Sequence, residues 1–338
     1  MPEPMKIAIA GAGMISWFHL VGWRNLGERV RVVAVCDPDE DRARKRADEF
    51  AIPRVYRDAD TMFAAEAVDA LDVITPRQAH AVWVEAAAAR GIDALCQKPM
   101  TPTLAESEAL VRRVAGKCRL MAHENWRFRP WYRELKQWIA AGDLGDIVLA
   151  RMATLNSGLV PDPSGLRPLL TREPYCQVEE RLMVAEVLIH HLDVMRYLCG
   201  ELRVVAARGA RTVPDVVGET VAAIFLETAS GMPIEVSGTM VAAGLPARTL
   251  DRLELIGSKA SATFADSELR LHGPDPRSRH FDHERGYQAS FDAVISHFVD
   301  CLESGKPFET DPADNLETLR LVEHAYWAAG LQRSSETA

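Results

Sequence analysis

The 338-residue sequence has no excess of positive charge and no long apolar run. Acidic residues outnumber lysine and arginine by 48 to 39, so the formal net charge is −9. Without a broad basic surface, nucleic acid and anionic membranes are not expected partners. No apolar run is long enough to cross a bilayer, and the N-terminus enters a strand-like run without a leader pattern. We therefore expect a cytoplasmic globular protein.

Paired cysteines are also missing. The six cysteines are scattered and none belongs to a Cys-x-x-Cys pair, which argues against a zinc site or a disulfide framework. We accordingly expect no metal. Cys36 and Cys96 each end an apolar run, where a thiol packs as a small hydrophobe. The sequence has no internal repeat, and its length predicts about two domains.

The first apolar run ends at two glycines. Residues 7–10 predict a buried strand, Gly11 and Gly13 a tight turn, and the chain from Met14 onward a helix. In a dinucleotide-binding turn, such glycines let the backbone approach a pyrophosphate, which the N–H groups of the helix then bind. Ser16 stands where a third glycine is expected. Because glycines also occur in ordinary loops, this turn alone does not decide between the two interpretations.

A second apolar run, residues 30–36, ends at Asp37, which follows Ser16 by 21 positions (37 − 16 = 21). A dinucleotide fold places there the carboxylate that accepts hydrogen bonds from the adenosine ribose. The alternative is that Asp37 only starts the turn before the next helix. Its position at a predicted strand end favours the ribose role. Its negative charge would repel a 2′-phosphate, which predicts NAD as the cofactor.

Short apolar strands and charged helices alternate over residues 1–125, which indicates right-handed βαβ units. We therefore predict an α/β Rossmann domain with a parallel sheet over this range. Thr75 and His80 lie at the carboxyl edge of that sheet, where ligands bind, although either residue could equally cap the following helix. The predicted strands are 7–10, 30–37, 54–56, 70–75, 92–97 and 119–125, and the helices between them include 40–50, 61–66 and 103–116.

Lys98 directly follows one of these strands and precedes Pro99. An ammonium group at the mouth of a parallel sheet would favour loss of a hydroxyl proton by stabilising the developing alkoxide. The alternative is an ordinary lysine at a strand end.

Residues 126–338 have a different pattern, and we predict for them an α+β domain that binds substrate and mediates self-association. Period-two runs over 204–271 indicate a large, mostly antiparallel sheet with one covered face. The closing helix, 316–331, is a candidate to pack back on the first domain. The other predicted elements are a helix at 126–141, a strand at 147–155, a long loop at 156–177, a helix at 182–198, a polar loop at 274–285 and a helix at 288–304.

The predicted helix 182–198 carries Glu186, His190 and Asp193 on one face, at spacings of i, i+4 and i+7. His191 is turned about 100° away. A lone histidine is more often a structural hydrogen-bonding group. The two flanking carboxylates favour an oriented general base instead.

In this order the motifs resemble the Gfo/Idh/MocA family of NAD(P)-dependent oxidoreductases. The resemblance implies that Lys98, from a Glu-Lys-Pro motif, and His190, from an Asp-x-x-x-His-x-x-Asp motif, work at the nicotinamide face. Gln97 and Glu186 replace the family's usual glutamate and aspartate, and Arg77 stands where asparagine often follows Thr-Pro. The motifs are Gly11-Ala-Gly-Met-Ile-Ser16, Asp37, Thr75-Pro76 with His80, Gln97-Lys98-Pro99, and Glu186-Val-Leu-Ile-His190-His-Leu-Asp193.

The resemblance implies hydride transfer between NAD and a sugar or polyol, with a lactone as the product of a ring-form aldose. His190 would take the hydroxyl proton, Lys98 would stabilise the alkoxide and Glu186 would fix the substrate. The implied cofactor-binding residues are Gly11, Gly13, Met14, Ile15, Asp37, Thr75, His80, Gln97, Lys98 and Asn125, and weaker candidates for the substrate pocket are Arg127, Arg167, Tyr175 and Asp193.

Two other functions stay open. Some relatives use tightly bound NAD transiently to hydrolyse glycosides, and others bind a dinucleotide as sensors without turnover. The presence of both Lys98 and His190 disfavours the sensor. The resemblance also implies a homodimer or homotetramer.

Overall fold

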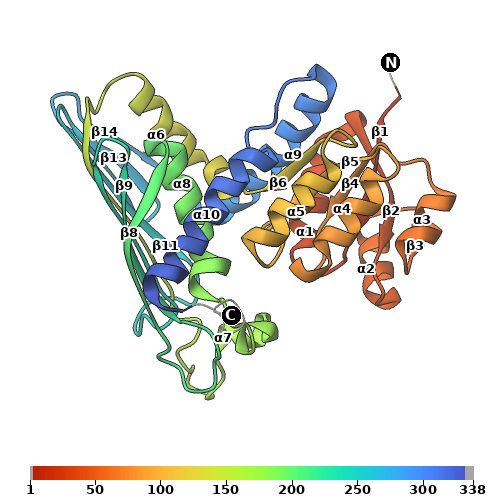
Figure 1. Ribbon diagram of the computed structural model, residues 1–338, viewed down its shortest axis with the longest axis horizontal. Coiled ribbons are helices and arrows are strands. Elements are labelled where there is room, and N and C mark those ends of the chain that lie inside the picture. The colour runs from red at the N-terminus through yellow and green to blue at the C-terminus, as the bar shows by residue number, and fades with distance from the viewer. Residues whose placement is uncertain (1–2, 332–338) are drawn as a thin grey trace. The chain divides into compact units, whose positions relative to one another are not determined.

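The computed structural model describes residues 3–331, which form two compact units (Figure 1). The first comprises 3–128 and 287–317, and the second comprises 129–286 and 318–331. The predicted boundary after residue 125 lies three residues before the observed one (128 − 125 = 3). The prediction also kept residues 126–338 together, whereas the structure assigns 287–317 to the first unit. The ends of the two predicted domains, 1–2 and 332–338, lie outside the described residues.

The first unit contains a six-stranded parallel sheet in the order β3-β2-β1-β4-β5-β6, so the predicted parallel sheet is confirmed. This is the strand order of a doubly wound dinucleotide-binding fold. Its strands are β1 (Met5–Ala10), β2 (Val30–Cys36), β3 (Arg54–Tyr56), β4 (Ala70–Val73), β5 (Asp93–Gln97) and β6 (Leu120–His123). The helices between them are α1 (Ser16–Asn25), η1 (Gly27–Arg29), α2 (Glu40–Phe50), α3 (Ala59–Ala65), η2 (Arg77–Ala79), α4 (His80–Ala88) and α5 (Leu104–Val114), with η3 (Trp126–Phe128) after β6.

Helix α9 (His283–Ser304) explains why the chain returns to the first unit. Its apolar side chains share one buried cluster with residues of the central strands and of helices α1 and α2. Phe291 is also buried, and its ring lies 5.2 Å from that of Phe18. An amphipathic pattern shows that a helix packs on a core, but it does not show which core. The α9 members of the cluster are Val294, Ile295, Phe298, Val299 and Cys301, and the strand members include Ile7, Ile9, Val35, Leu95 and Met121.

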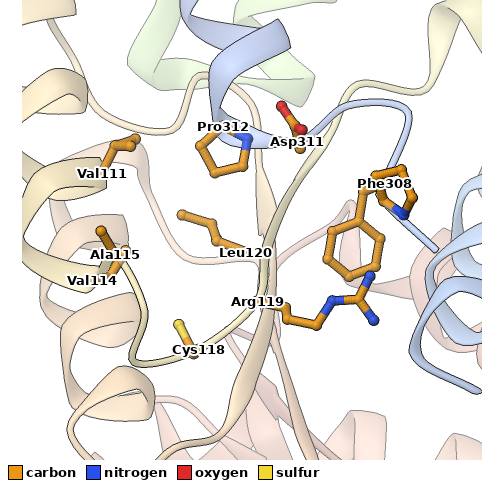
Figure 2. A pocket seen from close by; sticks show the side chains of 10 residues that line it. Val111, Val114, Ala115, Cys118, Arg119, Leu120, Phe308, Asp311 and Pro312 are labelled. Atoms are coloured by element: carbon orange, nitrogen blue, oxygen red, sulfur yellow. The ribbon is translucent and has the colours of Figure 1, made fainter. Parts of the chain in front are cut away.

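A cavity of about 270 Å³ lies at the amino end of β6 in the first unit. Figure 2 shows Val111 and Phe308 on opposite sides of it, with Leu120 between them. Burial raises the pKa of the nearby Cys118 thiol to about 11, so that thiol stays protonated at neutral pH. No residue predicted to bind cofactor or substrate lines this cavity.

The second unit is built on an eight-stranded sheet in the order β14-β13-β12-β11-β7-β10-β9-β8. Neighbours pair antiparallel except β7 and β10, which confirms the mostly antiparallel prediction. Strand β14 falls in the predicted polar loop, because its mostly exposed side chains give no apolar signal although its backbone pairs with β13. The strands are β7 (Ile147–Leu155), β8 (Leu202–Ala210), β9 (Val221–Thr228), β10 (Pro233–Thr239), β11 (Leu250–Gly257), β12 (Ser261–Ala265), β13 (Glu268–His272) and β14 (Arg277–His280).

Helices of the second unit lie against one face of this sheet (Figure 1). Inward-facing residues of β9, β10 and β11 alternate with more exposed ones, as a sheet with one covered face requires. The predicted long loop contains two short helices. The helices are α6 (Pro130–Ala140), α7 (Pro168–Arg172), η4 (Pro174–Gln177), η5 (Met183–Leu188), α8 (Ile189–Cys199) and α10 (Pro312–Ala329), of which α10 begins in the first unit. Among residues 3–331, no helix is long and apolar enough to span a membrane.

The predicted helix 182–198 is not a regular α-helix. Residues 183–188 form a π-helix, η5, and α8 follows. Side chains from elsewhere in the second unit satisfy its first amides: Glu219 Oε1 accepts from Val184 N at 2.9 Å, and Tyr326 Oη accepts from Ala185 N at 3.2 Å. The spacing of 3.6 residues per turn used to place Glu186 therefore does not hold there. Single π-turns frequently occur at functional sites.

Candidate active site

The turn between β1 and α1 has the geometry that its glycines predict. Gly11 has a φ of 101°, and a Cβ added to it would lie 2.6 Å from the carbonyl oxygen of Ile74. A Cβ at Gly13 would meet nothing within 4 Å. Within residues 3–331, the amides of Gly13, Met14 and Ile15 have no hydrogen-bond partner. Three N–H groups at the start of α1 thus have the arrangement that binds a phosphate.

The two glycines give a matched pair of variants. We expect Gly11→Ala to lower the free energy of unfolding by about 2–5 kcal/mol, because it adds backbone strain and a backbone clash. We expect Gly13→Ala to keep the melting temperature but weaken NAD binding, since its methyl group enters the space that the pyrophosphate needs. Thermal denaturation and NAD titration measure the two effects. Equal NAD affinity in Gly13→Ala and the unmodified protein would contradict the phosphate role of this turn.

Ser16 stabilises this turn through its hydroxyl group as well as through its small size. Its side chain is fully buried, and its hydroxyl donates to the carbonyl of Gly13 at 2.6 Å. Arg46 Nε donates to Ser16 Oγ at 3.0 Å, and Arg46 Nη2 donates to the Gly13 carbonyl at 3.2 Å. Arg46 was not predicted from the sequence, because it stands among other arginines of a charged helix.

Asp37 has the structural role that the sequence left open, and its contacts are compatible with the ribose role. The side chain is 8% exposed; its Oδ2 accepts from Ala12 N at 2.8 Å and its Oδ1 accepts from Asp39 N at 2.9 Å. It therefore ties the glycine turn to the end of β2. Each carboxylate oxygen keeps a further lone pair, so a ribose hydroxyl is still compatible with these contacts. The ribose role stays a prediction.

Thr75 and His80 differ in their hydrogen-bond partners. Thr75 Oγ1 is buried and has no hydrogen-bond partner within residues 3–331, as expected of a group that meets a ligand. His80 is 1% exposed, with Nε2 2.8 Å from the Thr75 carbonyl and Nδ1 2.9 Å from the Pro99 carbonyl. Both ring nitrogens thus face backbone oxygens. This geometry favours a structural role for His80 over cofactor binding.

Lys98 follows β5 at the same edge and precedes a cis peptide bond to Pro99. Its amide donates to Oε1 of the neighbouring Gln97 at 2.9 Å. Gln97 Nε2 in turn lies 2.9 Å from Nε2 of His19, whose Nδ1 lies 2.8 Å from Asp72 Oδ2. His19 and Asp72 were not predicted from the sequence. A carboxylate inside the apolar strand β4 was the signal that would have revealed them.

In the second unit, the loop before η5 reaches Glu186. Partial burial raises the pKa of Tyr175, and the negative charges of Glu186 and Glu173 raise it further. Burial, followed by the charges of Glu173 and Glu186, raises the pKa of Cys176 to about 12. His190 lies in α8 and is 6% exposed. The structure therefore gathers Glu186 and Tyr175, both predicted site residues, with Glu173 and Cys176, which the sequence analysis missed.

Four other predicted site residues have partners inside their own unit. Such contacts favour an anchoring role over direct contact with cofactor or substrate, most clearly for Asp193, whose side chain is fully buried. The contacts are Asn125 Nδ2 to Ser290 Oγ (2.8 Å), Arg127 Nη2 to Asp314 Oδ2 (2.9 Å), Thr318 Oγ1 to Asp193 Oδ1 (3.0 Å), and an ion pair between Arg167 and Asp215.

A buried ion-pair network anchors α8 beside His190. Asp251 Oδ1 lies 2.9 Å from His191 Nε2, and Asp251 Oδ2 accepts from Arg129 at 2.8 Å and from Tyr132 at 3.1 Å. Burial alone would raise the pKa of Asp251, but His191 and Arg129 outweigh it and hold that pKa well below its usual range. His191 Nδ1 lies 3.1 Å from the Val187 carbonyl. Because both ring nitrogens face acceptors, both hydrogen bonds form only when His191 is protonated.

These features fit a bound NAD in the first unit. The unpartnered amides at the start of α1, the Asp37 carboxylate and the Thr75 hydroxyl offer the polar groups that its pyrophosphate, ribose and nicotinamide parts need.

Comparison with known proteins agrees with this assignment. A family model described as an oxidoreductase family with an NAD-binding Rossmann fold matches residues 5–123, and a GFO/IDH/MocA C-terminal domain matches residues 132–263. A protein named D-apiose dehydrogenase from Paraburkholderia graminis is 33% identical, over 98% of this chain and 89% of that protein. Another of that name, from Rhizobium rhizogenes, is 30% identical, over 98% of this chain and 96% of that one.

Solved structures extend the comparison. An oxidoreductase from Agrobacterium radiobacter, solved in complex with NAD+, L-tartaric acid and magnesium, superimposes with a TM-score of 0.88. It is 29% identical, and the match covers 96% of both chains. The protein described here therefore belongs to the Gfo/Idh/MocA family and is an oxidoreductase with an NAD-binding Rossmann domain.

Proposed function

We propose that the protein is a dehydrogenase that oxidises a CH–OH group of a sugar or polyol with NAD, and that D-apiose is its substrate. The observation that carries the proposal is the carboxyl edge of the first sheet. There, Lys98 and the unpartnered Thr75 hydroxyl accompany a phosphate-binding turn. The names of the two D-apiose dehydrogenases, whose similarity spans 98% of this chain, support the choice of substrate.

In this proposal, bound NAD supplies the hydride acceptor. His190 accepts the proton of the reacting hydroxyl, since an imidazole ordinarily titrates near neutral pH. Lys98 stabilises the negative charge that develops on that oxygen. Glu186 accepts a hydrogen bond from a second substrate hydroxyl, with Tyr175 beside it. When a ring-form aldose is oxidised at C1, the product is a lactone.

A screen by NADH absorbance tests this function. We expect NADH to form with D-apiose, and with NAD rather than NADP, because the Asp37 carboxylate repels a 2′-phosphate. The panel includes myo-inositol, other pentoses and L-tartrate. NAD binding without NADH formation from any of these compounds would contradict the dehydrogenase. In that case, release of sugar from a glycoside without net NADH would identify an NAD-dependent hydrolase. The absence of both reactions would identify a sensor.

The proposal also includes a homodimer or homotetramer formed through the uncovered face of the eight-stranded sheet. Phe225 on β9 supports it: the side chain is 52% exposed, and its strand neighbours Ile224 and Leu226 are buried on the other face. Light scattering after gel filtration, with Phe225→Glu beside the unmodified protein, tests this assembly.

A further inference from the structure

A buried polar chain lies behind Lys98, entirely within the first unit. It runs from Asp72 on β4 through His19 on α1 to Gln97 on β5, with separations of 2.8 Å and 2.9 Å. Both His19 and Asp72 are 0% exposed. The proposed reaction uses none of these three side chains. A fully buried carboxylate is costly unless its partners are matched, so the direction of each hydrogen bond matters.

The backbone of Lys98 fixes these directions. A backbone N–H only donates, so the Gln97 atom that it meets at 2.9 Å is the carbonyl oxygen Oε1. The other end of that side chain is then the NH₂ group, which faces His19 Nε2. The reversed amide would place two donors against each other. Because an NH₂ group only donates, His19 Nε2 accepts and carries no proton.

The position of the remaining ring proton of His19 follows from this assignment. It lies on Nδ1 and is donated to Asp72 Oδ2, which also accepts from Trp23 Nε1 at 2.7 Å. His19 is thus neutral. The titratable groups that face it are Asp72 on β4 and His123 on β6, whose ring centroid lies 4.1 Å away, and Phe291 of α9 covers it at 5.3 Å.

We propose that Asp72, His19 and Gln97 are positioning residues that hold the backbone of Lys98. Glutamine is needed at position 97 because Asp72 already supplies a carboxylate to this hydrogen-bond network. A glutamate at 97 has no N–H to donate to His19 Nε2. That contact would then require a protonated His19 between the buried Asp72 carboxylate and the half-buried carboxylate at position 97. In the natural protein, the same contacts need only the neutral imidazole ring of His19.

The first test is the tautomer of His19, which does not depend on the proposed function. In protein labelled with ¹⁵N-histidine, two-bond ¹H–¹⁵N spectra distinguish a protonated Nδ1 from a protonated Nε2. A His19→Asn variant assigns the signal. We expect the Nδ1–H form throughout the neutral pH range. An Nε2–H form or an imidazolium at neutral pH would overturn the inference.

The second test is Gln97→Glu, with the exposed Gln78→Glu as the matched control. In Gln97→Glu, we expect His19 to be protonated at both nitrogens. We expect turnover to fall by about 10–100-fold as the pH rises and that proton is lost, because a hydrogen bond to a charged group breaks. Turnover of the unmodified protein and of Gln78→Glu should not fall in this way.

This second test rests on the proposed role of Lys98, and its outcomes are separable. A neutral His19 with an unchanged pH profile in Gln97→Glu would overturn the positioning role, whatever Lys98 does. If Lys98 substitution leaves turnover intact while His19 shows the Nδ1–H form, the proposed function fails and the hydrogen-bond assignment stands. Should Gln97→Glu not fold, the spectrum of the unmodified protein still decides the assignment.

Discussion

Replacing Lys98 with methionine should lower kcat by about 10²–10⁴-fold without changing the melting temperature. Methionine keeps an unbranched stem but removes the ammonium group that, in the proposed mechanism, stabilises the alkoxide. The hydrogen bond to Gln97 survives, because it uses the backbone amide of residue 98. The measurement is steady-state NADH formation at saturating substrate, with the exposed Lys45→Met as the control.

The companion variant His190→Asn should cause a loss of similar size and also change the pH profile. In the unmodified protein, kcat/KM should rise with pH as the imidazole loses its proton and becomes able to act as a base. That rise should be absent in His190→Asn and present in the exposed control His280→Asn. Near-normal turnover in both Lys98→Met and His190→Asn would refute the proposed mechanism.

Replacing Asp251 with alanine should lower the free energy of unfolding by about 3–5 kcal/mol. The carboxylate is buried between Arg129 and His191, and its removal deletes its ion-pair contacts with both side chains inside the protein. Urea denaturation measures the loss. Glu254→Ala is the matched control on the same strand, because Glu254 pairs with Arg151 at 3.6 Å on the exposed face and should cost less than about 1 kcal/mol.

The effect of Asp251 should also depend on pH in a defined direction. Its folded-state pKa lies below that of the unfolded chain, so it stabilises the protein above the unfolded value, about 3.9. That contribution is lost as the pH falls through the lower folded-state pKa. The difference in the free energy of unfolding between the unmodified protein and Asp251→Ala should therefore be largest at pH 7 and become smaller below about pH 4. A constant gap would show that packing, and not charge, explains the loss.

Sequence patterns predicted the first unit well because most of its strands, though not the edge strand β3, are buried on both faces. Such strands appear as short apolar runs, and the breaks between them are marked by glycine, proline and capping residues. Gly11 is the clearest case, because its positive φ and its contact with Ile74 allow no other residue. The rules of βαβ connection predicted the parallel sheet, whereas the order of its strands came from the structure.

The features that the sequence could not predict depend on residues far apart in the chain. The π-helix η5 arises where Ala185 meets Tyr326, 141 positions later, and Val184 meets Glu219, 35 positions later. A window of helical periodicity contains neither partner. Asp193 was placed correctly on a helix, but its bond to Thr318 uses it for anchoring.

The same limit applies to the candidate site. Lys98 and Thr75 became candidates because strand ends at the carboxyl edge of a parallel sheet are where ligands bind. Arg46 and His19 were missed, since an arginine in a charged helix and a histidine in an apolar one have no local sign of their partners. Their roles follow only from the contacts with Ser16 and Asp72.

The return of residues 287–317 to the first unit has a consequence for synthesis on the ribosome. Strand β6 ends at His123, so 163 further residues (286 − 123 = 163) must be made before this segment begins. Until then, the nascent sheet exposes the apolar surface that Ile295 and Phe298 later cover. The usual order, in which an N-terminal domain folds first, is therefore not available to this chain. Its dinucleotide-binding unit completes its core only when nearly the whole polypeptide has emerged.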